Sequence, residues 1–506
     1  MNSLFARKPI AELVPEGSEG TGLRRTLTTI DLVALSIGAV IGAGIFSSIG
    51  TAAAGQMAAD GVTVIRYGAG PALVLSFLLL GAICALAALC YAELAAMIPQ
   101  AGSAYAYSYA TLGEVVAWII GWDLILEYAV GNVAVAISWS GYFVSLLSGF
   151  GIEIPGWLAH GYREILLAAP DSPLKALMTE APQIAGIPVL LNVPAFLIVA
   201  AITWLLVIGV KESMRVNKAM VIVKLVVLAV FILVGVQHID MANYTPYAPN
   251  GFRGIHQGAA IVFFAYIGFD AISTAAEETK DPQRTMPRGI LLGLLVCTII
   301  YVAVGAVATG IVPYKQLLAN DPLAAAFDQA GLQQFTWFIS LGAVVATSAV
   351  LLVFQYGGPR ILMAMARDGL LPAWAAKIHP KYRTPHVMTM FTGAIVACWA
   401  LIGDAGETYD LTNIGTLFAF TIVAVGVMVL RKLEPDRHRP FRIKYVWLVA
   451  SVAAAACIFV MLGLPRQAWE RFAIWLALGL AVYFLYGRKR SHLRRARDSA
   501  AASGGE

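Results

Sequence analysis

Charged residues are scarce in this chain. Asp, Glu, Lys and Arg make up 13% of its 506 residues, whereas soluble domains contain about 25%. Hydrophobic residues account for 59% of the sequence, and the mean hydropathy is +0.75. This composition excludes a soluble globular protein and predicts an all-α polytopic membrane protein.

The signatures of several other protein classes are also missing. The five cysteines lie in apolar runs, without a CxxC pair or a histidine at ligand spacing, so we expect no disulfide and no metal site. The sequence has no GxxxxGK[ST] motif, which argues against an ATP-driven pump subunit, and no Ser/His/Asp or nucleotide-binding signature. We therefore expect neither an enzyme nor a bound cofactor. Residues 1–25 are polar and show no cleavable signal peptide.

Long apolar runs are abundant instead. About twelve are long enough to cross the roughly 30 Å hydrocarbon core of a bilayer. The third run is too long for one upright helix, so it is either strongly tilted or ends in an interfacial piece. The expected spans are 31–51, 71–98, 115–147, 193–210, 220–236, 258–275, 289–312, 335–355, 387–402, 414–430, 446–464 and 472–486.

The basic residues predict the orientation of these spans. With the N-terminus inside, the inner segments hold roughly 27 Lys and Arg residues and the outer segments about 7, as the positive-inside rule favours. We therefore expect a multi-pass protein of the cell membrane with both termini in the cytoplasm. The net charge of +5 then requires no nucleic-acid partner, and the basic tail serves as a topology signal and a contact for anionic membrane lipid.

The first span carries three glycines within seven residues, namely Gly38, Gly42 and Gly44. Glycine costs about 1 kcal/mol relative to alanine inside a helix, so Gly42 and Gly44 predict a break in this span. Irregular backbone at membrane depth is tolerated where it lines a polar cavity, and there its N–H groups can receive a carboxylate. Close helix packing through small residues is the alternative.

The sixth span contains a second candidate break at Gly268 and Asp270. An acid at the bilayer centre costs at least about 2.5 kcal/mol and therefore faces the bundle interior or water. Spans one and six occupy corresponding positions if the chain consists of two five-helix repeats. Interrupted helices in corresponding positions point to a transporter binding site between the repeats.

Two further ionisable residues lie deep within spans. Lys224 is a lone cation among apolar residues, so it must reach a partner, lose its proton or extend to the cytoplasmic surface. Glu127 is the second candidate: it can bind a proton or a positive ligand, or pair with Asn132 or a neighbouring hydroxyl. We expect Asp123 to face the cytoplasmic vestibule. Asp270, Glu277 and Glu278 are interpreted as structural or gating residues.

Residues 148–192 form a long, weakly charged outer segment interrupted by prolines. We expect it to pack over the outer mouth of the protein. A contact site for a small single-span membrane subunit is the alternative.

Several motifs resemble those of the amino acid–polyamine–organocation superfamily of transporters, and among them the bacterial relatives of the cationic amino acid transporters. The resemblance runs through nearly all spans. The matching motifs are Gly38-x-x-Ile41-Gly42-Ala43-Gly44-Ile45-Phe46, residues 91–105, Gly209-Val210-Lys211-Glu212-Ser213, residues 263–270, and Ala366-Arg367-Asp368-Gly369-Leu370-Leu371-Pro372.

This resemblance implies a five-plus-five inverted repeat of the leucine-transporter type, with helices one and six broken, followed by two accessory helices. The corresponding divisions are a cytoplasmic N-terminal segment (1–30), a ten-helix transport core (31–430), accessory helices eleven and twelve (431–487) and a basic cytoplasmic tail (488–506).

The resemblance also implies a role for each site residue. The backbone of Ile41, Gly42, Ala43 and Gly44 would receive the substrate carboxylate, although Ala43 replaces a hydroxyl residue common in the family. The carbonyls of Phe264, Ala265 and Ile267 would receive the ammonium group, and Phe269 would close over the ligand. Lys224 would occupy the place of a sodium ion, contacting span-one carbonyls and a hydroxyl of Thr347 or Ser348. Glu127 resembles an acid that reaches the substrate region.

The sequence therefore predicts a secondary active transporter for L-amino acids that works by alternating access, coupled to protons and independent of sodium. An amino-acid or polyamine exchanger, a non-transporting amino-acid sensor and a channel are the alternatives. Whether the substrate is cationic or small and neutral stays open, because backbone ligands recognise only the group that all amino acids share.

Overall fold

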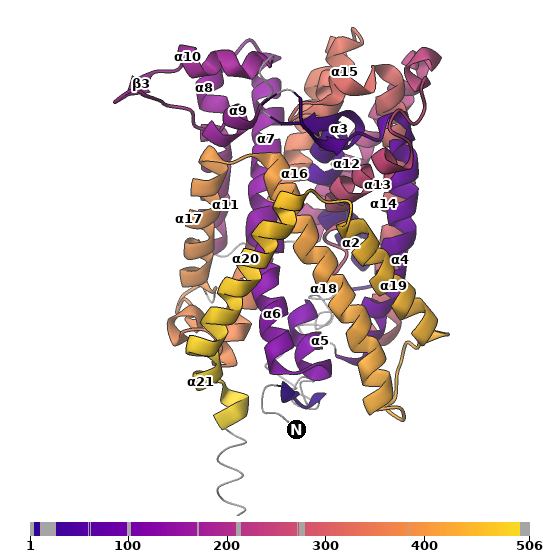
Figure 1. Cartoon of the computed structure of the whole chain (residues 1–506), viewed down its shortest axis with the longest axis vertical. Coiled ribbons are helices and arrows are strands. Elements are labelled where there is room, and N and C mark those ends of the chain that lie inside the picture. The colour runs from indigo at the N-terminus through magenta and orange to yellow at the C-terminus, as the bar shows by residue number, and fades with distance from the viewer. Residues whose placement is uncertain are drawn as a thin grey trace, which may run out of the picture.

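The computed structural model describes residues 5–10, 27–58, 60, 62–98, 103–168, 172–208, 214–270, 272, 279–382 and 384–495; within these, the side chains of 214–218 and of 282 are left aside. In this part of the chain the structure is an elongated bundle of helices with two short hairpins (Figure 1). The predicted all-α polytopic architecture is thus confirmed at the level of a helical, multi-span membrane protein.

Apolar helices make up most of the bundle. Within the described residues, eight helical stretches are long and apolar enough to cross a membrane, and three shorter apolar helices accompany them. The main helices are α2 (Thr29–Val40), α3 (Ile49–Ala54), α4 (Leu73–Met97), α5 (Ser103–Thr111), α6 (Glu114–Ile125), α7 (Gly131–Ser148), α11 (Val193–Ile208), α12 (Met214–Gly235), α13 (Gly251–Val262), α14 (Pro282–Ile311), α15 (Pro322–Gln329), α16 (Gln333–Arg367), α17 (His386–Ile402), α18 (Ala405–Leu433), α19 (Val446–Met461), α20 (Arg466–Val482) and α21 (Arg488–Arg490).

Many spans begin or end a few residues away from their expected bounds, and three of them are informative. The third is one continuous helical stretch of 35 residues, Glu114–Ser148, with no separate interfacial helix split off at its end. The eighth, α16, also has 35 residues and continues through Pro359 to Arg367, beyond the expected end at 355. The sixth begins earlier than expected, at Gly251, and its regular helix ends at Val262, inside the apolar run.

The helices pack in two groups. In the first group, α14 packs against α2 and α4, and α13 packs against α3 and α4. In the second group, α16 packs against α7 and α17, and α11 packs against α7 and α17. Helix α12 contacts both groups through α2, α14 and α16, so it joins them.

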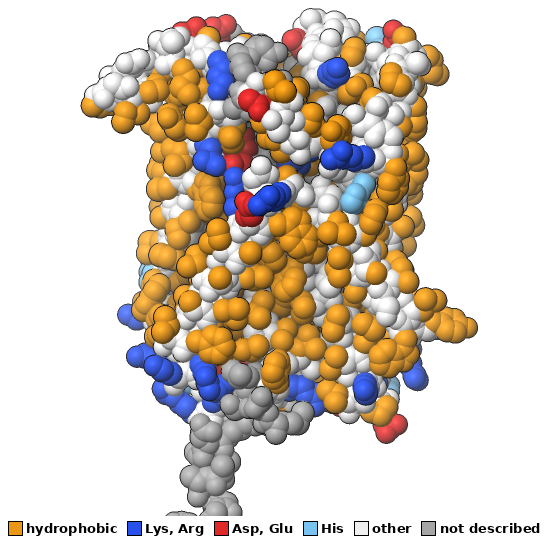
Figure 2. All heavy atoms as spheres, in the orientation of Figure 1, with side chains coloured by type: hydrophobic (Ala, Val, Ile, Leu, Met, Phe, Trp, Pro, Cys, Tyr) orange, Lys and Arg blue, Asp and Glu red, His pale blue; other side chains and the backbone are white. Residues whose placement is uncertain are grey.

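The two ends of the bundle differ. One end, which we call the cap end, carries α15 and the segment that links α7 to α11, with α8 (Gly156–Ala159), α9 (Tyr162–Leu167), α10 (Leu177–Glu180), β3 (Gln183–Ile184) and β4 (Ile187–Pro188) (Figure 1). The opposite, terminal end carries the N-terminal residues and α21. Figure 2 shows apolar side chains over the middle of the bundle and basic side chains gathered at the terminal end.

Part of the basic tail is packed against the bundle. Arg494 Nε lies 2.9 Å from Oε1 of Glu114, whose side chain is fully buried at the start of the third span. Lys8 Nζ similarly lies 3.0 Å from Asp368 Oδ1 at the end of α16. The described part of the tail is therefore held by an ion pair, in addition to any contact that it makes with lipid, and the N-terminal segment is held by another.

Candidate binding site between two broken helices

The first span is broken where the glycines predicted. Helix α2 begins with a capping box between Thr28 and Asp31 and ends at Val40, because Ile41 adopts an extended conformation. A π-helical turn, Gly44–Ser48, follows and continues into α3. The break thus exposes the last carbonyls of α2 and the first N–H groups of the next helical segment, which have no partner within their own helix.

The two glycines of the break allow close approach by different kinds of neighbour. A Cβ on Gly42 would lie 2.3 Å from Cγ2 of Val350 on α16. A Cβ on Gly44 would lie 2.1 Å from the Cα atom of Ala265 in the sixth span. Gly42 therefore lies against a side chain of the second helix group, and Gly44 lies against the backbone of the other broken helix.

The sixth span changes conformation at the same depth. After α13, residues Phe263–Tyr266 form a 3₁₀ turn, Ile267 is extended, and Gly268 has a φ of +114°. A side chain at this φ would be strained, and a Cβ there would also lie 3.0 Å from the carbonyl oxygen of Ala39. The two irregular segments are thus in direct contact, with glycine on each side.

Tyr301 of α14 links the two breaks. Its hydroxyl group lies 2.9 Å from the carbonyl oxygen of Val40 and 2.8 Å from that of Ala265, and the side chain is buried. One of the three carbonyls expected to receive an ammonium group, that of Ala265, therefore already accepts a hydrogen bond. A carbonyl oxygen has two lone pairs, so a second donor can still be accommodated.

Lys224 reaches the break in the first span. Its Nζ atom donates to the carbonyl oxygens of Gly38 at 2.9 Å and Ile41 at 2.7 Å, and the side chain is fully buried. The lysine therefore does not extend to the surface. Neither candidate hydroxyl contacts it among the described residues: Thr347 bonds back to Ala343, and Ser348 bonds to Val344 and Trp139.

Glu127 lies in a second helical irregularity. The third span contains a π-helical turn, Leu126–Val130, and the Glu127 carboxyl group within it accepts a hydrogen bond from the Thr416 hydroxyl of α18 at 3.2 Å. Of the two partners considered for Glu127, the structure forms the bond with a hydroxyl group, since Asn132 donates to Gln355 instead. The carboxyl group of Asp270 lies beside Glu127, and both side chains are buried.

Asp123, one turn before Glu127, is buried with 1% exposure. A Cβ on Gly415 would lie 2.6 Å from its Oδ1 atom, so the carboxyl group points towards α18. The expectation that it faces an open vestibule is therefore wrong, because the packing of α18 against the third span covers it. Glu277 and Glu278 lie outside the described residues.

Phe269 is enclosed by aromatic rings. Its ring centroid lies 5.9 Å from that of Tyr91 on α4 and 4.9 Å from that of Phe420 on α18, and its side chain is buried. Phe269 thus packs the sixth span against α4 and α18 through aromatic contacts.

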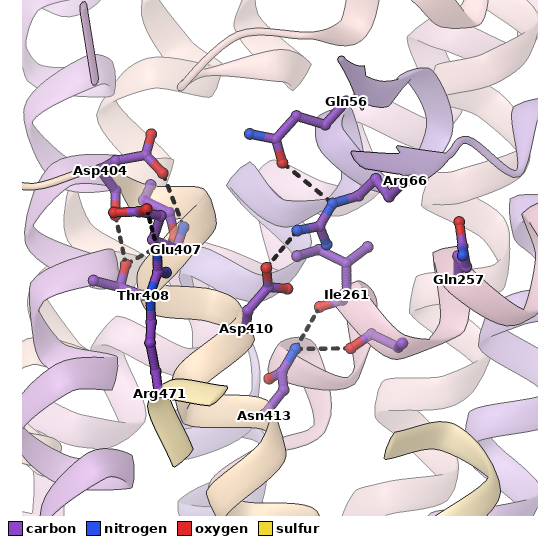
Figure 3. A network of polar contacts seen from close by, with 12 residues as sticks. Gln56, Arg66, Gln257, Ile261, Asp404, Glu407, Thr408, Asp410, Asn413 and Arg471 are labelled. Atoms are coloured by element: carbon purple, nitrogen blue, oxygen red, sulfur yellow. Dashed lines mark hydrogen bonds and ion pairs between the residues drawn. The ribbon is translucent and has the colours of Figure 1, made fainter. Parts of the chain in front are cut away.

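A polar network lies on the cap side of the breaks (Figure 3). Arg66 of the hairpin formed by β1 (Gly55–Met57) and β2 (Val64–Tyr67) donates to Asp410 on α18 at 2.5 Å and to Gln56 at 3.2 Å. Three residues further along α18, Asn413 donates to the carbonyl oxygens of Ala260 at 2.8 Å and Ile261 at 3.1 Å. Helix α18 is therefore bonded to both the hairpin and the end of α13.

The same network extends to the cap. Near the start of α18, Glu407 accepts hydrogen bonds from Arg471 of α20 and from Arg163 of α9. The segment between the third and fourth spans is thus bonded to the start of α18 through Arg163, and its expected place over the outer mouth stays a prediction.

The structure thus brings together the residues that sequence analysis selected at Ile41–Gly44, Phe264–Phe269 and Lys224, with Glu127 next to Asp270. Tyr301, Thr416 and the Arg66–Asp410 pair are not predicted by the sequence. Asp410 and Asn413 are polar residues three apart at the start of a span, which is a signal for an inward-facing polar stripe. Tyr301 is one amphipathic residue in a long apolar run, and nothing in the sequence marks it.

Comparison with known proteins agrees with this geometry. Residues 27–483 match the model of the amino acid permease family. The chain is 44% identical to the branched-chain amino acid permease BcaP of Bacillus subtilis, over 97% of this chain and 99% of that protein. It is also 44% identical to the methylthioribose transporter of the same species, over 98% and 100% of the two chains.

A more distant similarity connects it to the cationic amino acid transporters. The chain is 37% identical to the vacuolar cationic amino acid transporter 4 of Arabidopsis thaliana, over 86% of this chain and 68% of that protein. Residues 27–483, which the family model matches, contain both broken helices, Lys224 and Glu127. On these matches, the chain belongs to the amino acid permease family of the amino acid–polyamine–organocation superfamily.

Proposed function

We propose that the protein is a secondary active transporter of L-amino acids in the cell membrane, coupled to protons and independent of sodium. In this proposal it works by alternating access, with both termini in the cytoplasm and the cap end outside. The observation that carries the proposal is the contact of the buried Lys224 ammonium group with the two carbonyls at the break of the first span.

Recognition of the amino acid follows from the ends of the broken helices. The N–H groups at Gly42, Ala43 and Gly44 lie at the positive end of a helical segment and suit a carboxylate. The carbonyls of Phe264, Ala265 and Ile267 lie where the sixth span unwinds and suit an ammonium group. Ile41 completes the backbone contacts, and the Phe269 ring excludes water from the charged ends of the ligand.

Coupling to protons follows from the place of Lys224. A hydrogen bond from a charged donor is about twice as strong as one from a neutral donor. Release of a proton from Nζ therefore weakens both bonds to the first span and frees that helix from α12. Glu127, beside Asp270, supplies a second buried group that can hold a proton during the cycle.

Alternation follows from the two helix groups. The broken helices pack with α4 and α14, while α7, α11, α16 and α17 pack with one another. Rocking of the first group against the second would open the site to either side of the membrane in turn. Lys224 lies on α12, which contacts both groups, so its proton can control whether they move together.

The relatives differ in what their names say they carry, and so the substrate needs its own test. A cationic amino acid would place its side chain towards Glu127, whereas a small neutral one would leave that carboxyl group with Thr416. A methylthioribose-like substrate lacks both charged groups that the broken helices suit. Competition by all twenty amino acids, decarboxylated amines and methylthioribose against one labelled amino acid would separate these classes.

Uptake into proteoliposomes tests the proposal. We expect labelled amino acid to accumulate when the outside is acidified, to an equal extent in sodium and in choline. Lys224→Ala leaves the Gly38 and Ile41 carbonyls without their donor, so uptake driven by the pH gradient falls at least tenfold. Lys224→Arg keeps a permanent positive charge and fails to restore it.

Lys175→Ala is the matched control, because Lys175 also donates to a backbone carbonyl, that of Leu166, but at an exposed site in the cap. This variant is expected to transport normally. Sodium-dependent uptake, or full activity of Lys224→Ala, would contradict the proposed coupling. Absence of counterflow would instead indicate a sensor, and unsaturable flux a channel.

A further inference from the structure

The segment between α7 and α11 folds into a small unit of its own on the cap end. Ile165, Ala181 and Leu190 form its apolar core, with Trp157, Leu177 and Met178 packed around them. From this core a two-stranded antiparallel hairpin extends, in which Gln183 pairs with Pro188 and Ile184 with Ile187. The turn consists of Ala185 and Gly186, both with positive φ, as in the tight turns that match the twist of a hairpin.

The tip of this hairpin is apolar and exposed. Ile184 is 70% exposed and Ile187 is 64% exposed, and a Cβ added to Gly186 would meet nothing within 4 Å. No charged residue occurs anywhere from Ala181 to Val210. A turn that faces water is ordinarily built from polar residues, so this tip is poorly matched to an aqueous surrounding.

The tip lies at the side of the molecule, beside two of the apolar helices. Figure 1 shows β3 at the outer edge of the cap, to the side of α11 and α17. Only five positions separate Pro188 from the first residue of α11, a distance of at most about 17 Å in extended chain. Asn192 N also donates to the carbonyl oxygen of Leu401 at the end of α17, which fixes the chain at this level.

The tip is continuous with a surface that already faces lipid. On α11, Leu197 is 58% exposed and Trp204 is 67% exposed, as expected for a span at the outside of the bundle. The hairpin precedes this span and projects from the same side of the molecule (Figures 1 and 2). Lipid is therefore the apolar partner that this surface meets first.

The backbone of the hairpin is also suited to an apolar surrounding. Val189 N donates to the carbonyl oxygen of Pro182, closing the hairpin at its base. The flanking residues Pro182 and Pro188 have no N–H group, so they bring no unpaired donor to the tip. These features reduce the number of polar backbone groups that need a partner in the interfacial layer of a membrane.

We propose that the hairpin tip, Ile184–Ile187, inserts into the outer leaflet of the membrane and anchors the cap to the lipid surface. The anchored unit carries α9, whose Arg163 pairs with Glu407 of α18. Lipid would thereby hold the covering segment in place beside the outer mouth. The inference requires that the bundle spans a membrane, and the choice of the outer leaflet rests on the orientation proposed above; neither depends on the substrate.

A fluorescent label at the tip tests this. Ala185→Cys places one reactive thiol at the turn in a Cys398→Ala background, because the other four native cysteines are buried. An environment-sensitive dye on this thiol is measured in phosphatidylcholine vesicles. We expect blue-shifted emission, strong quenching by lipid that carries a spin label high on the acyl chain, and little quenching by aqueous iodide.

Two comparisons make the outcome decisive. A label introduced by Gln329→Cys, on the exposed end of α15 at the same end of the molecule, is expected to show the opposite quenching pattern. Replacing both tip residues by serine (Ile184→Ser, Ile187→Ser) is expected to shift the tip label towards the iodide-quenched pattern, whereas valine at both positions preserves lipid quenching.

Iodide quenching of the tip label equal to that of the Gln329→Cys label would overturn the proposal. Protection from both quenchers would also overturn it, because the tip would then be covered by protein. Since labelling needs no transport activity, failure here is distinguishable from failure of the proposed function.

Discussion

Gly42 and Gly44 lie two residues apart, yet only the defect of Gly42→Ala is expected to be repaired by a second substitution. A Cβ at position 44 would lie 2.1 Å from the Cα atom of Ala265 and 2.6 Å from its nitrogen. Ordinary contact begins at 3.4 Å, so the two broken helices would have to separate by about 1.3 Å. The conflict is with backbone, and no change of rotamer relieves it.

The size of the effect follows from what the separation disturbs. Overpacking of a buried site costs about 1–3 kcal/mol. A separation of this size would also break one of the two contacts between which the Tyr301 hydroxyl hydrogen is shared, worth about 1 kcal/mol. Together they penalise the closed arrangement of the broken helices by about 2–4 kcal/mol. Gly44→Ala is therefore expected to weaken amino-acid binding roughly 30- to 700-fold.

Gly42→Ala meets the Cγ2 methyl group of Val350 instead, at 2.3 Å. Its binding defect is expected to be largely repaired by Val350→Ala, which removes that methyl group. The same Val350→Ala change is not expected to repair Gly44→Ala. Ala265→Gly is not expected to repair it either, because the Cα atom of residue 265 remains.

Equilibrium binding of labelled amino acid to purified protein measures these effects, with size-exclusion chromatography to show that each variant is folded. Gly149→Ala is the control, because its Cβ would come no closer than 3.3 Å to any neighbour. Near-normal affinity of Gly44→Ala, or equal repair of both variants by Val350→Ala, would refute the reasoning.

Three further predictions concern the surroundings of the site. Phe269→Ala removes a ring that packs on Phe420, so the apparent KM for amino acid is expected to rise and turnover to fall, and unchanged uptake would exclude Phe269 from the site. Arg66→Met alone leaves the buried Asp410 carboxylate unpaired, at a cost of about 3–5 kcal/mol that is measured as a lower melting temperature. Adding Asp410→Leu is expected to restore most of the lost stability. A double variant as unstable as Arg66→Met would show that the unpaired carboxylate is not the cause. At the cap end, burial raises the pKa of Asp321 from 3.8 to about 7, so the folded protein binds this proton more tightly than the unfolded chain does. The free energy of unfolding therefore falls as the pH rises across that interval. Asp321→Asn is expected to make the melting temperature depend less on pH over the same range, and an unaltered pH dependence would contradict this.

Local chemistry made the breaks and the buried cation predictable. Glycine inside an apolar run signals irregular backbone, and a lysine there must find acceptors, so Gly42, Gly44 and Lys224 could be selected from their surroundings alone. Their partners could not be selected in the same way. Thr416 is 289 positions from Glu127, and Asp410 is 344 positions from Arg66, so only the packing of α18 brings these pairs together.

The helix ends show a related limit. Gly357, Gly358 and Pro359 read locally as the end of a span, yet α16 continues through them. An internal proline costs about 3 kcal/mol in an isolated helix. In the bundle, contacts of α16 with α7, α12 and α17 offset that cost, and such contacts are not encoded within the local sequence. Asp123 was placed wrongly for the same reason, because Gly415 of α18 covers it.

The Tyr301 hydroxyl has one hydrogen atom but two carbonyl oxygens within reach, at 2.9 Å on Val40 and 2.8 Å on Ala265. A single proton is therefore shared between two chain segments that lie more than two hundred residues apart. When the two segments move apart, the hydroxyl group can donate to only one of the two carbonyl oxygens. The Tyr301 hydroxyl group is therefore sensitive to the separation of the two broken helices. The O–H stretching frequency of an isotopically labelled tyrosine at this position would show whether these helices move as a single rigid body.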